Sequence, residues 1–153
     1  MNAQARDPEL YLPHEGTAVL LDEVWVVDTL STRGTTTVRA DTPFAQAADG
    51  WPAWFAIELM AQVVAASAGL REPRAGGRPR LGLLLGVRAF ECRYPRFDLG
   101  ARLIIEALES TRDERGMGVF DCSIRIEEAL VSQATLSVFL PESVEEYLRS
   151  IEQ

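Results

Sequence analysis

The chain has 153 residues, of which 47% are hydrophobic and 25% are charged, and these values are typical of a single globular domain spanning residues 1–153. A formal net charge of −8 argues against general nucleic-acid binding, which depends on basic surface. No apolar run is long enough to span a bilayer, and residues 1–9 do not resemble a signal peptide. We therefore expect a cytoplasmic protein with neither a nucleic-acid nor a membrane partner.

The first third of the chain predicts a hairpin. Residues 1–10 are expected to be flexible. Runs of apolar and β-branched residues predict strands over 19–28 and 35–40. Arg33 and Gly34 form a turn signal between the two strands and predict that they pair.

One long helix is predicted over 53–68, with Pro52 in its first turn and Gly69 at its end. The helix is apolar on every side, which predicts burial on every side. Glu58 is the one carboxylate in this segment, and Gln62 lies one turn further along the same face.

The placement of Glu58 in an apolar helix indicates a role in catalysis. A buried carboxylate loses its hydration, so it must find partners or its pKa rises toward neutral. Beside an orienting amide, such a carboxyl group is a candidate general acid or base. We interpret Glu58 as catalytic and Gln62 as its support. The alternative interpretation is a structural carboxylate that accepts hydrogen bonds from backbone donors.

The second half of the chain predicts a sheet. A loop rich in proline, glycine and arginine covers residues 71–80, and strands are predicted over 81–93, 101–111, 117–126 and 130–140. A short amphipathic helix is predicted over 142–151, within the terminal segment 142–153. This order of elements predicts an α+β fold in which an antiparallel sheet of about six strands wraps around one long central helix.

Cysteine and histidine are scarce. Cys92 and Cys122 lie in apolar, strand-like stretches without metal-ligand spacing, so we expect buried free thiols, no metal and no other cofactor. His14 is the only histidine, and a single histidine after a proline is commonly a turn or core residue.

Two segments carry a resemblance to a known family. The first is Leu12-Pro13-His14 followed by Leu20-Leu21-Asp22 and Val24, and the second is Pro52 followed by Glu58, Met60, Ala61 and Gln62. In this order and spacing they resemble the hotdog-fold 3-hydroxyacyl-(acyl carrier protein) dehydratases, most closely the divergent branch of aryl polyene and related polyketide-like clusters. The resemblance extends from residue 11 to about residue 140 and implies a hotdog fold.

The chain also departs from that family. The family carries its catalytic histidine in a Gly-His-Phe-Pro loop before the helix, whereas the corresponding residues 44–51 are fewer and contain no histidine. A histidine-dependent mechanism would therefore have to use His14. Asp49 is a competing candidate, although its simpler interpretation is a solvated residue before a turn. Ala53 stands where the family has a glycine whose N–H faces the thioester carbonyl.

The resemblance implies a dehydratase that removes water from 3-hydroxyacyl thioesters on an acyl carrier protein, giving trans-2-enoyl thioesters in fatty acid or polyene biosynthesis. The predicted catalytic residues are Glu58 and His14, with Gln62 in support. Glu58 would protonate the hydroxyl, and either His14 or Glu58 itself, acting in both steps through water, would remove the α-proton. Two alternatives stay open. The chain could be a non-catalytic hotdog subunit of a heteromeric dehydratase, or a hotdog acyl thioesterase in which Glu58 activates water.

The substrate and partner sites are predicted as follows. The substrate-binding residues are Pro52, Ala53 and Trp54, and the aromatic residues Trp51, Trp54 and Phe55 either line an acyl tunnel or anchor the helix in the core. The implied partner is an acyl carrier protein with a 4'-phosphopantetheine-linked acyl chain. Carrier proteins are acidic, so docking on a chain of charge −8 requires grouped cations. The predicted docking residues are Arg71, Arg74, Arg78 and Arg80. A solvated surface loop is the simpler interpretation of this arginine group.

Association is predicted as well. A hotdog sheet has an edge strand that would invite aggregation if it stayed open. Pairing of two protomers would extend each sheet and cover that edge. We therefore expect a homodimer or a heterodimer with a related dehydratase.

Overall fold

The computed structural model describes residues 4–13, 16–42, 50–71, 82–140, 149 and 151–152. Short 3-10 turns precede the sheet at η1 (Pro8–Leu10) and η2 (Gly16–Ala18). The one long helix among the described residues is α1 (Phe55–Arg71). The strands are β1 (Glu23–Val26), β2 (Ser31–Thr37), β3 (Trp51–Pro52), β4 (Leu83–Cys92), β5 (Arg96–Phe97), β6 (Arg102–Arg112), β7 (Met117–Ile126) and β8 (Ala129–Phe139).

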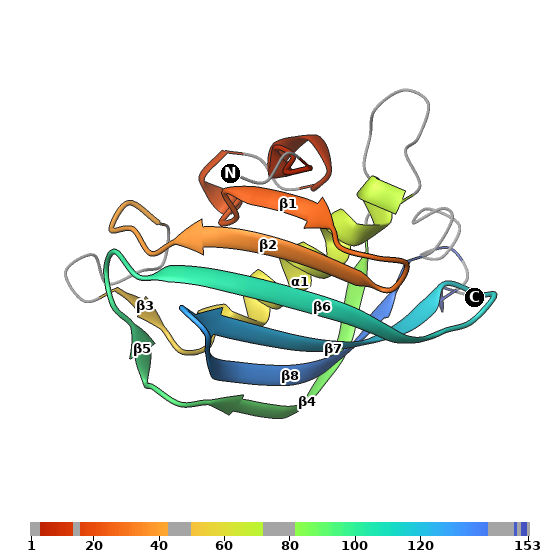
Figure 1. The fold of residues 1–153 in the computed structure, drawn as a ribbon. Coiled ribbons are helices and arrows are strands. Elements are labelled where there is room, and N and C mark those ends of the chain that lie inside the picture. The colour runs from red at the N-terminus through yellow and green to blue at the C-terminus, as the bar shows by residue number, and fades with distance from the viewer. Residues whose placement is uncertain are drawn as a thin grey trace.

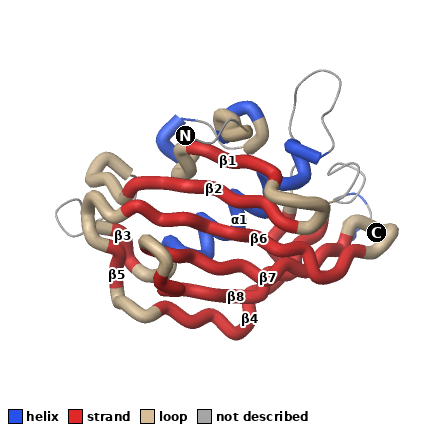
Figure 2. Tube along the Cα trace, viewed as in Figure 1, coloured by secondary structure: helices blue, strands red, loops and turns tan. Residues whose placement is uncertain are grey.

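Six strands form one antiparallel sheet in the order β1-β2-β6-β7-β8-β4. The sheet curves, and α1 lies against its concave side, as the ribbon and the tube both show (Figures 1 and 2). A separate pair, β3 and β5, joins the segment before the helix to the segment after β4. The predicted α+β architecture with one central helix is confirmed.

The predicted hairpin forms, but its turn lies elsewhere. Arg33 and Gly34 are in the middle of β2, where Gly34 pairs with Val24 of β1 and Ile105 of β6. A Cβ at Gly34 would lie 2.9 Å from a methyl group of Val63 on α1, so this glycine lets the helix approach the sheet. Reading the glycine as a turn signal was therefore wrong.

The turn between β1 and β2 is built on Asp28. Its carboxylate accepts hydrogen bonds from the backbone N–H groups of Leu30 and Ser31, each at 2.9 Å. These bonds lower the pKa of Asp28 because they favour the charged form. Strand β1 is shorter than the predicted strand 19–28 at both ends. Strand β2 begins four residues before the predicted strand 35–40 and ends three residues before its end.

The helix continues past its predicted end at Gly69. A Cβ at Gly69 would lie 3.1 Å from the carbonyl oxygen of Tyr11, so this glycine allows the N-terminal segment to pack closely on α1. Within segment 1–10, which we expected to be flexible, Arg6 and Val24 exchange two backbone hydrogen bonds of 2.8 and 3.1 Å. That part of the segment lies along the outer edge of β1.

The strands of the second half match their predicted ranges within two residues, and 117–126 coincides with β7. No pattern in the sequence predicts the short pair β3 and β5. The predicted terminal helix over 142–151 lies almost wholly outside the described residues.

The composition of the helix predicted burial on every side, and this prediction was wrong. The side of α1 that faces the sheet is fully covered, with Leu59, Met60 and Val63 at 0% exposure. The other side is only half-buried and carries Ile57, Glu58, Ala61 and Ala65. The reason is that the sheet covers one face of the helix within this chain, and the opposite face stays open beside the edge strand β4.

Candidate functional site

Glu58, on the half-buried side of α1, meets the buried side chain of Gln62 one turn further along the helix. The Gln62 amide nitrogen donates a hydrogen bond of 3.0 Å to Oε1 of Glu58. The predicted proximity of the two side chains, one helical turn apart, is therefore confirmed. The catalytic role of Glu58 remains a prediction.

The Gln62 side chain is completely buried, at 0% exposure. Its Oε1 accepts a hydrogen bond from the Leu20 N–H at 3.0 Å, and its Nε2 donates a second one to the Ala18 carbonyl at 2.8 Å. Both amide protons and the amide oxygen are thus engaged, which fixes the orientation of the amide. Gln62 holds one oxygen of Glu58 and also ties residues 18–20 to the helix.

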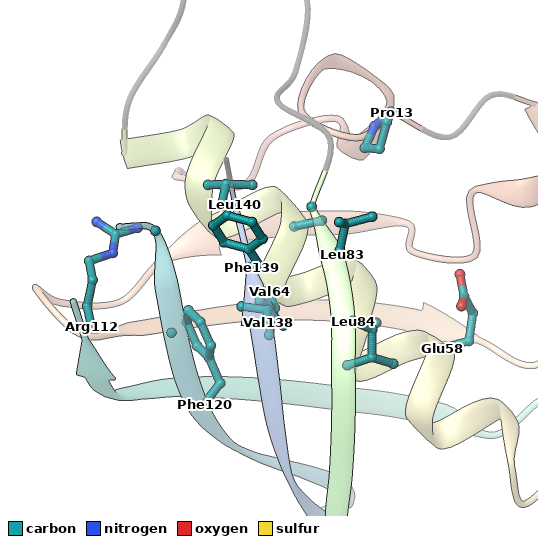
Figure 3. Close-up of a pocket in the computed structure, with 15 residues that line it drawn as sticks. Pro13, Glu58, Val64, Leu83, Leu84, Arg112, Phe120, Val138, Phe139 and Leu140 are labelled. Carbon is teal, nitrogen blue, oxygen red and sulfur yellow. The ribbon is translucent and has the colours of Figure 1, made fainter. Parts of the chain in front are cut away.

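A cavity of about 260 Å³ begins at Glu58 and continues between α1 and the strands β4, β7 and β8. This volume is close to the lower end of the ~300–1,000 Å³ typical of small-molecule sites. Most of its lining is apolar. Figure 3 shows Glu58 on one side of the group formed by Val64, Leu83 and Val138, with Phe120 and Arg112 on the opposite side. The cavity can hold an apolar chain whose reactive end meets a carboxyl group.

The aromatic residues predicted as tunnel lining do not line this cavity. Trp51 is fully buried, and its indole N–H donates to Thr42 Oγ1 at 3.0 Å. Its ring lies 5.5 Å from that of Phe55, between centroids. These two residues anchor the helix start in the core, whereas Trp54 is 54% exposed.

The other predicted substrate-binding residues have structural contacts. Pro52 belongs to β3 and pairs with Arg96 of β5. The N–H of Ala53 donates a hydrogen bond of 3.0 Å to the Pro95 carbonyl, so this donor is engaged within the fold. The contact of these residues with substrate stays a prediction.

Apart from Glu58, sequence reasoning missed the residues that line the cavity, because they come from elements far apart in the chain. Pro13, Ala61, Ala65, Gly118 and Phe120 are among them. One signal was available: Ala61 and Ala65 follow Glu58 by three and seven residues, so small side chains continue its face of the helix. Nothing local in the sequence indicated the strand residues opposite.

Arg71 is held at the end of α1 by the β1–β2 turn. Its guanidinium donates to the carbonyls of Thr29 at 2.6 Å, Asp28 at 2.9 Å and Ser31 at 2.9 Å. It therefore closes the helix end against the sheet. The other predicted docking residues lie outside the described part of the chain, as do two candidate catalytic groups: Arg74, Arg78, Arg80, His14 and Asp49.

The two cysteines are free thiols in the structure. Burial raises the pKa of the Cys122 thiol to about 12, whereas Cys92 is half-buried at the end of β4. Within the described ranges, no group of three His, Cys, Asp or Glu side chains could hold a metal ion. None of the helices described there is long and apolar enough to cross a bilayer.

Comparison with known proteins places this geometry in a family. The profile of the ApeP-like family, described as ApeP dehydratase, matches residues 6–149. The chain is similar to a chain in the structure of the dehydratase heterocomplex ApeI:P from Xenorhabdus doucetiae, with 31% identity, a TM-score of 0.85 and coverage of 97% of this chain and 99% of that one. Among curated protein sequences, none matches.

More distant structures share the fold alone. The protein TT0310 from Thermus thermophilus is 22% identical with a TM-score of 0.60, over 88% of this chain and 98% of that one. A hypothetical thioesterase with coenzyme A from Streptococcus pneumoniae is 17% identical with a TM-score of 0.58, over 77% of this chain and 86% of that one. The hotdog fold predicted from the sequence is confirmed.

Proposed function

This chain belongs to the ApeP-like dehydratase family, and from that premise we propose that it takes part in removing water from 3-hydroxyacyl thioesters carried on an acyl carrier protein. The product is a trans-2-enoyl thioester, and the pathway is aryl polyene biosynthesis. The observation that supports this most strongly is Glu58 at one end of an apolar cavity, hydrogen-bonded to a fully buried amide.

Elimination needs two proton transfers. A base takes the proton from the α-carbon, its electron pair forms the new double bond, and the bond between the β-carbon and the hydroxyl oxygen breaks. Glu58 is the acid that protonates the departing hydroxyl, which leaves as water. The hydrogen bond from Gln62 favours the carboxylate that remains on Glu58 after the proton has gone.

The base that removes the α-proton has two candidates. His14 is the only imidazole in the chain, and it follows Pro13, which lines the same cavity as Glu58. The similar chain from Xenorhabdus doucetiae belongs to the dehydratase heterocomplex ApeI:P. We propose that the base is either His14 or a group supplied by a second, related dehydratase chain.

The edge strand β4 supports association with such a chain. Leu84, Leu85 and Phe90 are 45%, 50% and 36% exposed, and an open apolar edge invites pairing with another strand. We propose a heterodimer with a related dehydratase, with a homodimer as the alternative. Native mass spectrometry of the chain alone and with the partner would test this, and a stable, active monomer would contradict it.

Carrier docking is proposed at the loop after α1. Arg74, Arg78 and Arg80 would supply the grouped positive charge, and Arg71 would hold the start of the loop against the β1–β2 turn. Replacing the three loop arginines by glutamate should raise KM for carrier-bound substrate, most at low salt. KM for a free pantetheine thioester should stay nearly unchanged, and equal losses for both substrates would refute docking at this loop.

Product analysis separates the proposed activity from its alternatives. The complex is incubated with a 3-hydroxyacyl carrier protein, and the carrier is analysed by intact-protein mass spectrometry. Dehydration removes the mass of one water and leaves the acyl chain attached, whereas a thioesterase releases the whole acyl chain. A non-catalytic subunit would leave the rate of the partner unchanged when Glu58 is replaced.

A further inference from the structure

The cavity extends along α1, away from the atoms that take part in the proposed reaction. It starts at Glu58 and follows the open face of α1 past Ala61 to Ala65. The seven steps along the helix from Glu58 to Ala65 rise about 10 Å at roughly 1.5 Å per residue. An acyl chain whose β-carbon lies at Glu58 would therefore extend its apolar tail away from the reacting atoms and along the helix.

Gly118 lies on the cavity wall opposite the helix, in β7. A Cβ built at this position would lie 3.2 Å from Cε2 of Phe120 and 3.6 Å from Cγ2 of Val138, and both of those side chains also line the cavity. The nearest backbone atom is the carbonyl oxygen of Thr111, at 3.7 Å. A side chain at residue 118 would thus extend among the lining side chains, without a backbone clash.

The backbone does not explain why residue 118 is glycine. The neighbouring Gly116 has a φ of 100°, and a Cβ there would lie 2.5 Å from the Leu140 carbonyl oxygen, so the turn before β7 requires glycine. Gly118 has no positive φ and pairs regularly with Val138. Glycine inside a strand costs stability and often marks a place where another group comes close. Two groups come close here: the ring of Phe120, whose Cε2 lies 3.2 Å from the Cβ position, and the content of the cavity that both residues line.

We propose that Gly118 sets the length of the acyl chain that this cavity accepts. The inference rests on the proposed function, because it takes the occupant to be the acyl chain of a thioester whose β-carbon lies at Glu58. Three backbone bonds of an extended chain span about 3.3–3.6 Å, or roughly 1.2 Å per bond. The distance of about 10 Å along the helix then admits about eight carbons beyond the β-carbon.

The test is the chain-length profile of the intact complex with Gly118→Val. The substrates are crotonyl, octenoyl and dodecenoyl pantetheine, and hydration of the double bond is followed by its absorbance. The kcat/KM for dodecenoyl pantetheine should fall at least about tenfold relative to that for crotonyl pantetheine, since lost burial of two methylenes suffices for this. Ser123→Val places the same side chain on the outer face of β7 and should change neither value.

A second variant narrows the cavity from the helix side. Ala65→Leu retains a strong helix former and should shift the profile in the same direction, so the test survives if Gly118→Val does not fold. The inference is overturned if both folded variants keep the unmodified ratio of dodecenoyl to crotonyl activity.

Binding distinguishes failure of this inference from failure of the proposed function. Dodecanoyl pantetheine, which cannot react by elimination, is titrated calorimetrically into each complex. Weaker binding to Gly118→Val together with full turnover by Glu58→Gln would contradict the proposed reaction and leave the chain-length inference standing. Unchanged binding and an unchanged profile in Gly118→Val, with turnover lost in Glu58→Gln, would overturn the inference alone.

Discussion

Replacement of Gln62 by leucine tests how much the site contributes to the stability of the fold. Gln62→Leu keeps a side chain of similar volume and removes three hydrogen bonds, to Leu20, Ala18 and Glu58. The Leu20 N–H then has no partner in a buried environment, which costs about 1–3 kcal/mol. The Ala18 carbonyl is nearer to solvent, so the loss of its hydrogen bond costs closer to the net value of about 1 kcal/mol.

The free energy of unfolding should therefore fall by about 2–4 kcal/mol. With a denaturant slope of roughly 2 kcal/mol per molar urea, the midpoint of urea unfolding shifts down by about 1–2 M. Far-UV circular dichroism follows the transition. The denaturant slope itself should not change, because the folded and unfolded states expose nearly the same surface as before.

Gln133→Leu is the matched control. Gln133 also donates a hydrogen bond to a glutamate, at 2.9 Å from Glu91 Oε2, but on the exposed side of β8. Its loss should change the free energy of unfolding by no more than about 0.5 kcal/mol. If Gln62→Leu were as mild as Gln133→Leu, the buried amide would not hold residues 18–20 and Glu58 as the contacts indicate.

Three further predictions concern other described groups. Arg71→Met removes the donors to the β1–β2 turn and should lower the free energy of unfolding by about 1–3 kcal/mol, while an unchanged urea midpoint with a raised KM for carrier-bound substrate would show that Arg71 serves docking instead. Asp28 has a lowered pKa in the folded state, so its stabilising effect is present above the unfolded pKa of about 3.9 and is lost as the pH falls through the folded pKa. Asp28→Ala should therefore lower the melting temperature at neutral pH and make little difference in acid. An equal loss of melting temperature at both pH values would contradict this. Burial raises the pKa of Cys122 to about 12, so iodoacetamide at mildly alkaline pH should modify Cys92 and leave Cys122 unmodified until the protein unfolds; equal rates for the two thiols would contradict the burial of Cys122.

The sequence predicted those features that depend on local spacing. The interval of four residues brought Glu58 and Gln62 together, and long apolar runs marked α1 and the strands from β6 to β8. Glycine was less informative, because one residue type serves several purposes. The sequence patterns around Gly34 and Gly69 predict a turn and a helix end, whereas both glycines allow a neighbouring segment to approach closely.

The cavity could not be predicted from local patterns. Its walls combine Pro13, the open face of α1, and residues in and next to β4, β7 and β8, and only the folded sheet brings these together. The half-buried side of α1 was missed for a related reason, since composition shows that a helix is apolar but not how much of it the sheet covers. Glu58 could be found because a carboxylate in an apolar helix stands out, whereas Gly118 resembles any other glycine in a strand.

The most direct test of the account is the activity of Glu58→Gln in the assembled complex. This substitution keeps the shape of the side chain and a hydrogen-bonding end beside Gln62, and it removes the proton that the reaction needs. Turnover of a 3-hydroxyacyl carrier protein should fall on the order of a hundredfold or more, with an unchanged circular dichroism spectrum and unchanged assembly with the partner. A folded, assembled Glu58→Gln complex that dehydrates its substrate at the unmodified rate would contradict the catalytic role of Glu58.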